Sequence, residues 1–262
     1  MTLTSFSLEG FKGMPVLVVA NSLSASTAMW DAQVPLWSKH FQVLRYDYRG
    51  HGNTPAVGDR ASITDLANDL LELLTDLKID QFHFAGLSLG AMLGIHMAAT
   101  QPQRVQSLVA SNFRPFQTDE TRLQWNQRLD VVLENGVGAI VDGTADRWLR
   151  QEFRQQHPQT AARIRTMIGA TTREGYLACA QAVRDYDARP LLAQVRCPVH
   201  LISGTEDLAA PPAEIAALQS GFRQSAYVCL PAAHLANVEC ATDYSRIVLD
   251  FLLGQPATPA RP

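Results

Sequence analysis

The sequence predicts an α/β protein with a doubly wound, mostly parallel sheet into which a helical cap is inserted. Short apolar runs alternate with helix-like stretches up to residue 111 and again after residue 190, which is the pattern of parallel strands joined by crossover helices. Between residues 112 and 189 the pattern is helical throughout. The chain is therefore predicted to consist of a core (residues 1–111 and 190–254), a cap (112–189) and a proline-containing, disordered tail (255–262).

In the first part of the core, strand-like and helix-like segments follow one another in a regular order. Residues 15–20 are continuously apolar and rich in β-branched side chains, as expected for a strand that is buried on both faces. Residues 63–77 carry leucine and alanine at helical spacing behind Ser62, which predicts an amphipathic helix. The other predicted strands are residues 2–8 at the sheet edge, 41–45, 82–85 and 105–111, and a short helix is predicted for 29–40.

The cap and the second part of the core are assigned in the same way. Helices are predicted in the cap at residues 120–134, 137–142, 145–157, 159–168 and 173–184. The alternation then resumes with a strand at 197–203, a helix at 211–220, a strand at 225–230 and a closing helix at 244–253.

Composition excludes several classes of protein. A hydrophobic content of 47% and a charged content of 18% are typical of a globular chain, and a net charge of −3 does not favour binding to nucleic acid. No stretch approaches the roughly 20 apolar residues of a membrane span. The four cysteines lack metal-site spacing, and the N-terminus lacks a signal-peptide pattern. We therefore expect a cytoplasmic protein without a disulfide frame or a metal site; the sequence does not indicate its oligomeric state.

The residues most informative about function form the pattern Gly-x-Ser-x-Gly at positions 86–90. This pattern predicts a sharp turn between a strand and a helix, with glycine at two crowded positions. Ser88 is then presented at the carboxyl end of the strand and at the N-terminus of a helix, where free N–H groups favour negative charge. The alternative interpretation is an ordinary N-cap serine in a glycine-rich turn.

A serine nucleophile requires a base and an acid that orients the base. His234 follows the last predicted strand, among small residues, and is the predicted base; His51, in a glycine-flanked turn, is the weaker alternative. Asp207 follows the preceding predicted strand and is the predicted acid, with Glu206 as the neighbour that could replace it. The resulting order of nucleophile, acid and base differs from the trypsin and subtilisin orders.

Ester or lactone hydrolysis also needs donors for the oxyanion. One is predicted to be the backbone N–H of Leu89, directly after Ser88, and the other the backbone N–H of Leu23, in the loop after the strand at residues 15–20. Such chemistry requires no cofactor and no metal.

These residues and several further stretches resemble the α/β-hydrolase superfamily and, within it, the 3-oxoadipate enol-lactonases (beta-ketoadipate enol-lactone hydrolases) of aromatic catabolism. The resemblance extends over about residues 15–253, through ANSL at 20–23, MWDAQVP at 29–35, VLRYDYRGHG at 43–52, FAGLSLG at 84–90, AVRDYD at 182–187, GTED at 204–207 and AAHLANVE at 232–239. It departs at Ser24 and Ala91, which stand where the family usually has glycine, and in the segment NFRPF at 112–116.

The resemblance implies an α/β-hydrolase fold and a carboxylic-ester hydrolase whose substrate is 3-oxoadipate enol-lactone, with a small molecule as its partner. Arg147 or Arg114 of the cap would bind the free carboxylate of that substrate, and Trp148 and Trp125 would line the pocket or pack between cap helices. The alternatives left open are a carboxylesterase, a homoserine-lactone hydrolase, a carbon–carbon bond hydrolase, a perhydrolase, or a ligand-binding receptor on a hydrolase scaffold.

Overall fold

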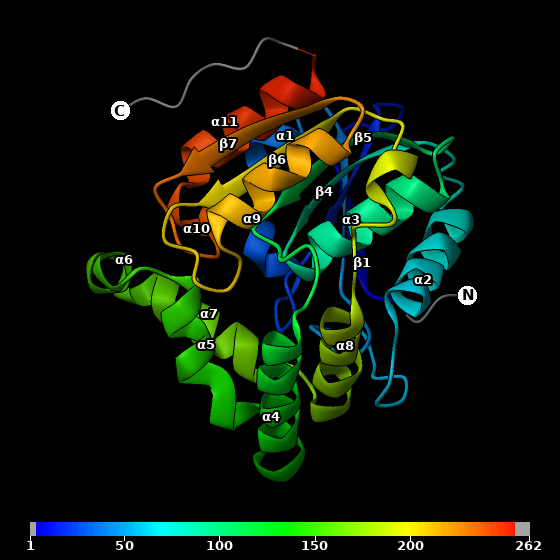
Figure 1. Cartoon of the computed structure of the whole chain (residues 1–262). Coiled ribbons are helices and arrows are strands. Elements are labelled where there is room, and N and C mark those ends of the chain that lie inside the picture. Colours follow the sequence, from blue (N-terminus) through cyan, green and yellow to red (C-terminus); the bar gives the residue numbers. More distant parts are fainter. Residues whose placement is uncertain (1–3, 255–262) are drawn as a thin grey trace.

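A computed structural model describes residues 4–254 and shows a single seven-stranded sheet with helices on both faces (Figure 1). The strand order is β1-β3-β2-β4-β5-β6-β7, and every neighbouring pair is parallel except β1 with β3. The predicted fold class is confirmed. The strands are β1 (Phe6–Glu9), β2 (Val16–Ala20), β3 (Gln42–Tyr46), β4 (Phe82–Leu87), β5 (Val105–Ser111), β6 (Val199–Gly204) and β7 (Ser225–Leu230).

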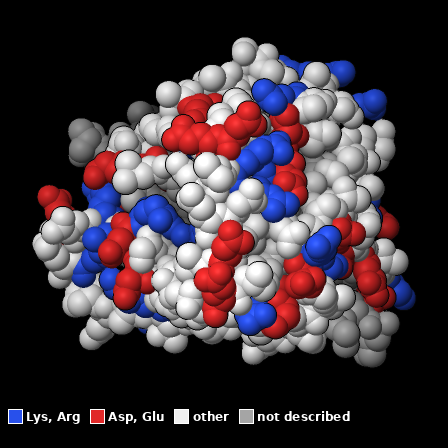
Figure 2. Space-filling model, turned by 60° about the horizontal axis from the view of Figure 1, so that its bottom comes forward, with Lys and Arg blue, Asp and Glu red and all other residues white. Residues whose placement is uncertain are grey.

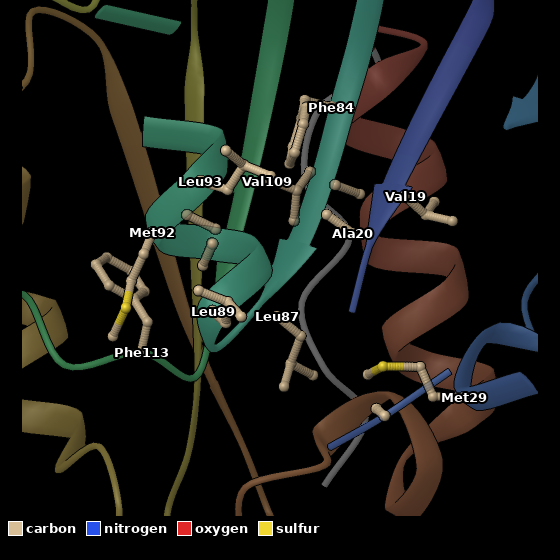
Figure 3. Close-up of a cluster of buried hydrophobic side chains, with 14 of the residues drawn as sticks. Val19, Ala20, Met29, Phe84, Leu87, Leu89, Met92, Leu93, Val109 and Phe113 are labelled. Atoms are coloured by element: carbon tan, nitrogen blue, oxygen red, sulfur yellow. The ribbon is translucent and has the colours of Figure 1, made fainter. Parts of the chain in front are cut away.

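Two crossover helices illustrate why the sheet has this arrangement. Helix α2 (Ile63–Asp76) begins at a capping box made by Ser62 and Asp65 and buries one leucine-rich side. Helix α3 (Leu89–Thr100) is buried almost all round because it packs between the sheet and its neighbouring helices. Helix α2 packs against α3 and is more exposed. Figure 3 shows side chains of α3, among them Leu89 and Leu93, packed with those of the adjacent strands.

The helical segment between β5 and β6 lies along one end of the sheet, at the bottom of Figure 1. It consists of α4 (Asp119–Asn135), η2 (Val137–Ile140), α5 (Val141–Trp148), α6 (Gln151–Gln156), α7 (Pro158–Gly169) and α8 (Arg173–Asp185). The two chain segments that connect it to the core run antiparallel, with a bridge between Phe116 and Asp187 and a hydrogen bond of 2.7 Å from Ala188 N to Pro115 O. We refer to residues 112–189 as the cap.

Two predicted helices are interrupted in the structure. The segment 29–40 forms two short pieces, η1 (Thr27–Trp30) and α1 (Val34–Trp37), because Pro35 starts a new helix in its first turn. The predicted helix 145–157 is broken after Trp148, where Leu149 is extended. The break has a tertiary cause: the N–H of Arg150 donates to the carboxylate of Glu239 at 2.7 Å, a distant acceptor outside the helix.

Near the C-terminus, α9 (Pro212–Ala217) is shorter than predicted and continues as η4 (Leu218–Gly221). The predicted closing helix begins earlier, as α11 (Ala241–Leu252), and a one-turn helix α10 (Ala236–Glu239) precedes it. A short 3-10 turn, η3 (Leu192–Gln194), precedes β6. The predicted tail 255–262 lies outside the described residues. Within residues 4–254, no helix has both the length and the apolar character needed to cross a membrane.

Candidate active site

Ser88 lies at the turn between β4 and α3 with φ 59° and ψ −116°, a backbone conformation that residues other than glycine seldom adopt. Such a backbone costs about 1–3 kcal/mol and persists only when its surroundings fix it. Here the surroundings are very close: a Cβ on Gly86 would lie 2.1 Å from the carbonyl oxygen of Gly90, and a Cβ on Gly90 would lie 2.0 Å from that of Ala20. The two glycines therefore allow the turn that exposes Ser88.

The first turn of α3 leaves backbone donors beside Ser88. The carbonyl oxygen of Ser88 accepts hydrogen bonds from Ala91 N and Met92 N, at 3.0 and 3.1 Å. The preceding N–H groups, beginning with that of Leu89, have no intrahelical acceptor because they belong to the first turn. Together with the helix dipole, they make the space beside the Ser88 side chain favourable for a negative oxygen.

His234 and Asp207 lie together, as predicted, although 27 positions separate them in the chain. Asp207 follows β6 and His234 follows β7, and these neighbouring parallel strands end at the same edge of the sheet. His234 Nδ1 is 2.9 Å from Asp207 Oδ2. Because an ionised carboxylate can only accept, Nδ1 carries the proton and donates it to this bond. The second ring nitrogen, Nε2, is left as the acceptor.

Asp207 is 3% exposed, and every described contact of its carboxylate is with a donor. Oδ1 accepts from the backbone N–H groups of Ala209 and Ala210, at 2.9 and 3.0 Å, and Oδ2 also accepts from Asn112 Nδ2, at 3.1 Å. Burial raises the pKa of Asp207, but the charge and hydrogen bond of His234 and the hydrogen bonds of Asn112 and Ala210 outweigh it, so that the pKa is lowered. The carboxylate is thus ionised at neutral pH.

The loop that carries His234 is held by Trp148 of the cap and by Glu239 of α10. Leu235 N donates to Trp148 O at 3.0 Å, and Ala233 N donates to the buried carboxylate of Glu239 at 2.5 Å. The Trp148 ring stacks on the His234 ring, with centroids 6.2 Å apart and planes inclined by 30°. The break between α5 and α6 therefore serves to seat the cap against the histidine loop.

A cavity of about 390 Å³ lies between this edge of the sheet and the cap, a size suited to a small molecule. Its floor contains Ser88, His234 and Leu23, and its roof contains all four cap residues named from the resemblance, Arg114, Trp125, Arg147 and Trp148. Asp207 lies behind His234, and Leu89 is fully buried at the start of α3. The other residues around the cavity are Ser22, Ser24, Met92, Gln117, Thr121, Gln124, Arg128, Thr144, Tyr176, Val183, Leu208, Ala209 and Ala210.

The arginines around the cavity differ in their partners. Arg114 pairs with Glu214 at 3.2 Å. Arg128 donates to the hydroxyl groups of Tyr176 and Thr144, at 2.6 and 2.5 Å, and among residues 4–254 neither Arg128 nor Arg147 has a carboxylate within ion-pair distance. Burial, and next the nearby charge of Arg128, lower the pKa of Arg147. The roof therefore carries positive charge that no side chain of the described chain neutralises.

The outer face of the cap contrasts with this cavity. Most cap arginines pair with nearby carboxylates, and Figure 2, which views the molecule from the cap end, shows basic and acidic residues interspersed over this face. The pairs include Arg154–Asp146, Arg165–Asp142, Arg184–Asp185 and Arg189–Asp187. The cap as a whole is therefore not strongly basic, and, within residues 4–254, Arg128 and Arg147 are the arginines without an ion pair that line the cavity.

Comparison with known proteins agrees with this geometry. Residues 15–240 match the family model described as the alpha/beta hydrolase fold. The chain belongs to the α/β-hydrolase family. It is similar to the enol-lactonase of Burkholderia xenovorans LB400, whose crystal structure superposes with a TM-score of 0.92 at 34% identity and with 95% of this chain and 96% of that chain covered. The resemblance inferred from the sequence is confirmed.

Two curated relatives of this α/β-hydrolase have different names. The 3-oxoadipate enol-lactonase 1 of Acinetobacter baylyi is 27% identical over 249 residues, which are 95% of this chain and 92% of the relative. A protein of Serratia proteamaculans, provisionally named carbamate hydrolase RutD, is 30% identical over 251 residues, with 91% of each chain covered. Similarity over the whole chain therefore shows a hydrolase and leaves the substrate to be argued from the site.

Sequence reasoning missed several residues at the site of this hydrolase. Asn112 has φ 48° and bonds Asp207, and asparagine directly after a strand end could have suggested such a left-handed position. Arg128 and Tyr176 come from α4 and α8, and no motif distinguishes them from other cap residues. Only the packing of these two helices brings their side chains to the cavity.

Proposed function

We propose that this hydrolase opens a small lactone or ester that carries a carboxylate, and that its substrate is 3-oxoadipate enol-lactone. The observation that carries the proposal is the hydrogen-bonded pair of Asp207 and His234, placed with Ser88 at one cavity whose roof contains unneutralised arginines. The similarity to enol-lactonases supports the choice of lactone.

In the first half of the reaction, Ser88 Oγ attacks the lactone carbonyl while His234 Nε2 accepts the hydroxyl proton. Asp207 holds the imidazole in the required tautomer and stabilises the imidazolium. The negative oxygen of the tetrahedral intermediate accepts hydrogen bonds from the backbone N–H groups of Leu23 and Leu89, each worth about 3 kcal/mol in the transition state. The ring C–O bond then breaks, and His234 returns the proton to the leaving enol oxygen.

The second half repeats these steps with water. The ring-opened acid remains esterified to Ser88, and the enol tautomerises to a ketone. His234 takes a proton from a water molecule, which attacks the acyl carbon, and the serine oxygen leaves with that proton. The products are the dicarboxylate and the free enzyme, so the reaction needs no electron carrier or metal.

The cap arginines explain why a carboxylate-bearing substrate is favoured. An anion bound between Arg128 and Arg147 would offset the repulsion between their charges and would replace the hydration that Arg147 loses on burial. Charge-assisted hydrogen bonds of this kind contribute about 1.5–3 kcal/mol. Arg114 is the weaker candidate because Glu214 already neutralises it. Trp125 and Trp148 would enclose the ring of the substrate.

The proposal is tested by assaying the purified protein on 3-oxoadipate enol-lactone and on a panel of other substrates. The panel comprises p-nitrophenyl acetate, an acyl-homoserine lactone, a carbon–carbon bond substrate and a carbamate, the last because of the Serratia relative. We expect kcat/KM to be highest for the enol-lactone, by at least tenfold. A higher value for the carbamate or a neutral ester would assign the site to that substrate class instead.

A ligand-binding receptor with the same scaffold is distinguished by covalent labelling. A fluorophosphonate probe should modify Ser88 stoichiometrically in the wild-type protein and should not modify Ser88→Ala. Failure to label the folded wild-type protein would favour the receptor.

A further inference from the structure

His51 is fully buried, and the proposed reaction does not use it. It lies in the loop between β3 and α2, with Nδ1 3.0 Å from the carbonyl oxygen of Arg49 and Nε2 3.0 Å from the backbone nitrogen of Ser24. The first atom must donate and the second must accept. His51 is therefore neutral and held in one tautomer, and burial lowers its pKa to about 4.

The backbone N–H of Ser24, which donates to His51, belongs to the same turn as Leu23. Ala25 N donates to Ser22 O at 3.1 Å, which closes a four-residue β-turn. Ser24 is the third residue of this turn, with φ 66°, the positive value that a type II turn requires and that glycine usually supplies. For a serine this conformation costs about 1–2 kcal/mol.

The turn type sets the orientation of the peptide that directly follows the oxyanion donor, the N–H of Leu23. Types I and II differ mainly in the orientation of the central peptide, here the one that joins Leu23 to Ser24. With this peptide in the type II orientation, its N–H points at His51. The N–H of Leu23 has no acceptor among residues 4–254, and Leu23 lies at the cavity.

We propose that His51 is a positioning residue for the oxyanion hole. Its Nε2 accepts a hydrogen bond from the Ser24 N–H and so holds the turn in the form in which the Leu23 N–H is free to bind the oxyanion. This inference rests on the proposed function, because the turn has a catalytic use only if Ser88 attacks a carbonyl. It also explains how Ser24 can replace the glycine expected at this position: the hydrogen bond to His51 compensates for the unfavourable φ.

The loop of His51 is itself fixed by the cap. Thr172 N, at the start of α8, donates to Gly50 O at 2.9 Å, and a Cβ on Gly50 would lie 2.4 Å from Gly175 Cα. The Tyr48 ring meets the His51 ring edge to face at 6.0 Å. The imidazole is thus a rigid support between the cap and the turn.

The test compares His51→Phe, which keeps a ring but removes the acceptor, with His51→Gln, whose amide oxygen can accept the Ser24 N–H. The readout is kcat on p-nitrophenyl acetate per active site titrated with a fluorophosphonate. We expect His51→Phe to lower kcat by 10- to 100-fold with KM changed less than threefold, because the oxyanion forms only in the transition state. His51→Gln should recover at least a third of the wild-type kcat.

A second measurement uses a trifluoromethyl ketone, whose adduct with Ser88 places an oxyanion in the hole. Its affinity should fall in His51→Phe by the same factor as kcat. A purely structural role for His51 would lower the melting temperature and the number of titratable sites, with kcat per site unchanged. If His51→Phe does not fold, the same pair of substitutions is made in Ser24→Gly, where the positive φ is less costly.

The outcomes separate the two proposals. Wild-type protein that neither turns over the ester nor reacts with the probe contradicts the proposed function. Active wild-type protein together with a per-site kcat of His51→Phe within twofold of wild type contradicts only the role of His51. The role of His51 is also contradicted if His51→Gln and His51→Phe have equally low kcat per site while the ketone binds both variants with wild-type affinity.

Discussion

The charged groups at the floor and at the roof of the cavity differ in whether the protein supplies their partners. Behind the floor, next to His234, the carboxylate of Asp207 is surrounded by donors from His234, Asn112, Ala209 and Ala210. On the roof, Arg128 and Arg147 have no carboxylate partner among the described residues. The floor has its hydrogen-bond partners before a substrate arrives, whereas we propose that a carboxylate of the substrate pairs with the arginines of the roof.

This difference follows from what each wall must do. A group that acts in the transition state is most effective when its neighbours are already arranged, because no reorganisation is then needed during the reaction. A group that selects a substrate must keep its charge available for it. Floor substitutions should therefore affect every substrate, and roof substitutions should affect mainly those that carry an anion.

The largest effect is expected from Ser88→Ala or His234→Ala. Each should lower kcat about 10⁴-fold or more on every substrate, because nucleophile and base act as one unit. The melting temperature should remain near that of wild type, since both side chains lie at the cavity. Activity within tenfold of wild type in either variant would contradict the mechanism.

Asp207→Asn should lower kcat to a similar degree, by about 10⁴-fold. The amide can donate to Nδ1, which favours the tautomer with the proton on Nε2 and removes the acceptor that Ser88 needs. Circular dichroism and steady-state kinetics on the same preparation test this expectation. If Asp207→Asn keeps wild-type kcat, Asp207 is not the catalytic acid, and Glu206 becomes the candidate. Glu206 pairs with Arg150 at 3.5 Å.

A roof substitution should be selective. For Arg147→Met, we expect the ratio of kcat/KM for the enol-lactone to kcat/KM for p-nitrophenyl acetate to fall 10- to 100-fold, as expected for a lost charge-assisted hydrogen bond. Arg128→Met should behave likewise. Arg114→Met is the matched control, because Glu214 pairs with it, and it should change the ratio less than threefold. An equal loss on both substrates in Arg147→Met would contradict the anion site.

The smallest effect concerns stability at acidic pH. Burial lowers the pKa of His200 to about 4, and neither ring nitrogen has a hydrogen-bond partner among residues 4–254. The unfolded chain, with a histidine pKa near 6.5, then binds more protons than the folded chain between about pH 6.5 and 4. Stability due to this group is present at higher pH and is lost as pH falls through that window.

This pH effect is isolated by comparing the wild type with His200→Phe, since Asp47 and Glu239, whose pKa values are raised by burial, act in the opposite direction in both proteins. The free energy of unfolding from urea titration should fall more in the wild type between pH 7 and 4, by on the order of 2 kcal/mol. Parallel pH profiles would contradict the prediction.

The fold and the proposed triad could be predicted because their signals are local. Glycine at two positions permits the turn at Ser88, and apolar runs place Asp207 and His234 after strands that share one edge of the sheet. The cap helices were predicted less well. The break at Leu149 depends on Glu239, a residue 89 positions from Arg150, and no propensity at the break reveals it.

The sequence by itself determined the order of strands and helices, the exposed serine, and the candidates for base and acid, since turn chemistry and hydrophobic period are properties of neighbouring residues. Only the tertiary structure decided that Asn112 holds Asp207, that Arg128 joins Arg147 above Ser88, and that His51 supports the turn of Leu23. Each of these contacts joins segments that are far apart in the chain, and the packing of the cap and the sheet brings them together.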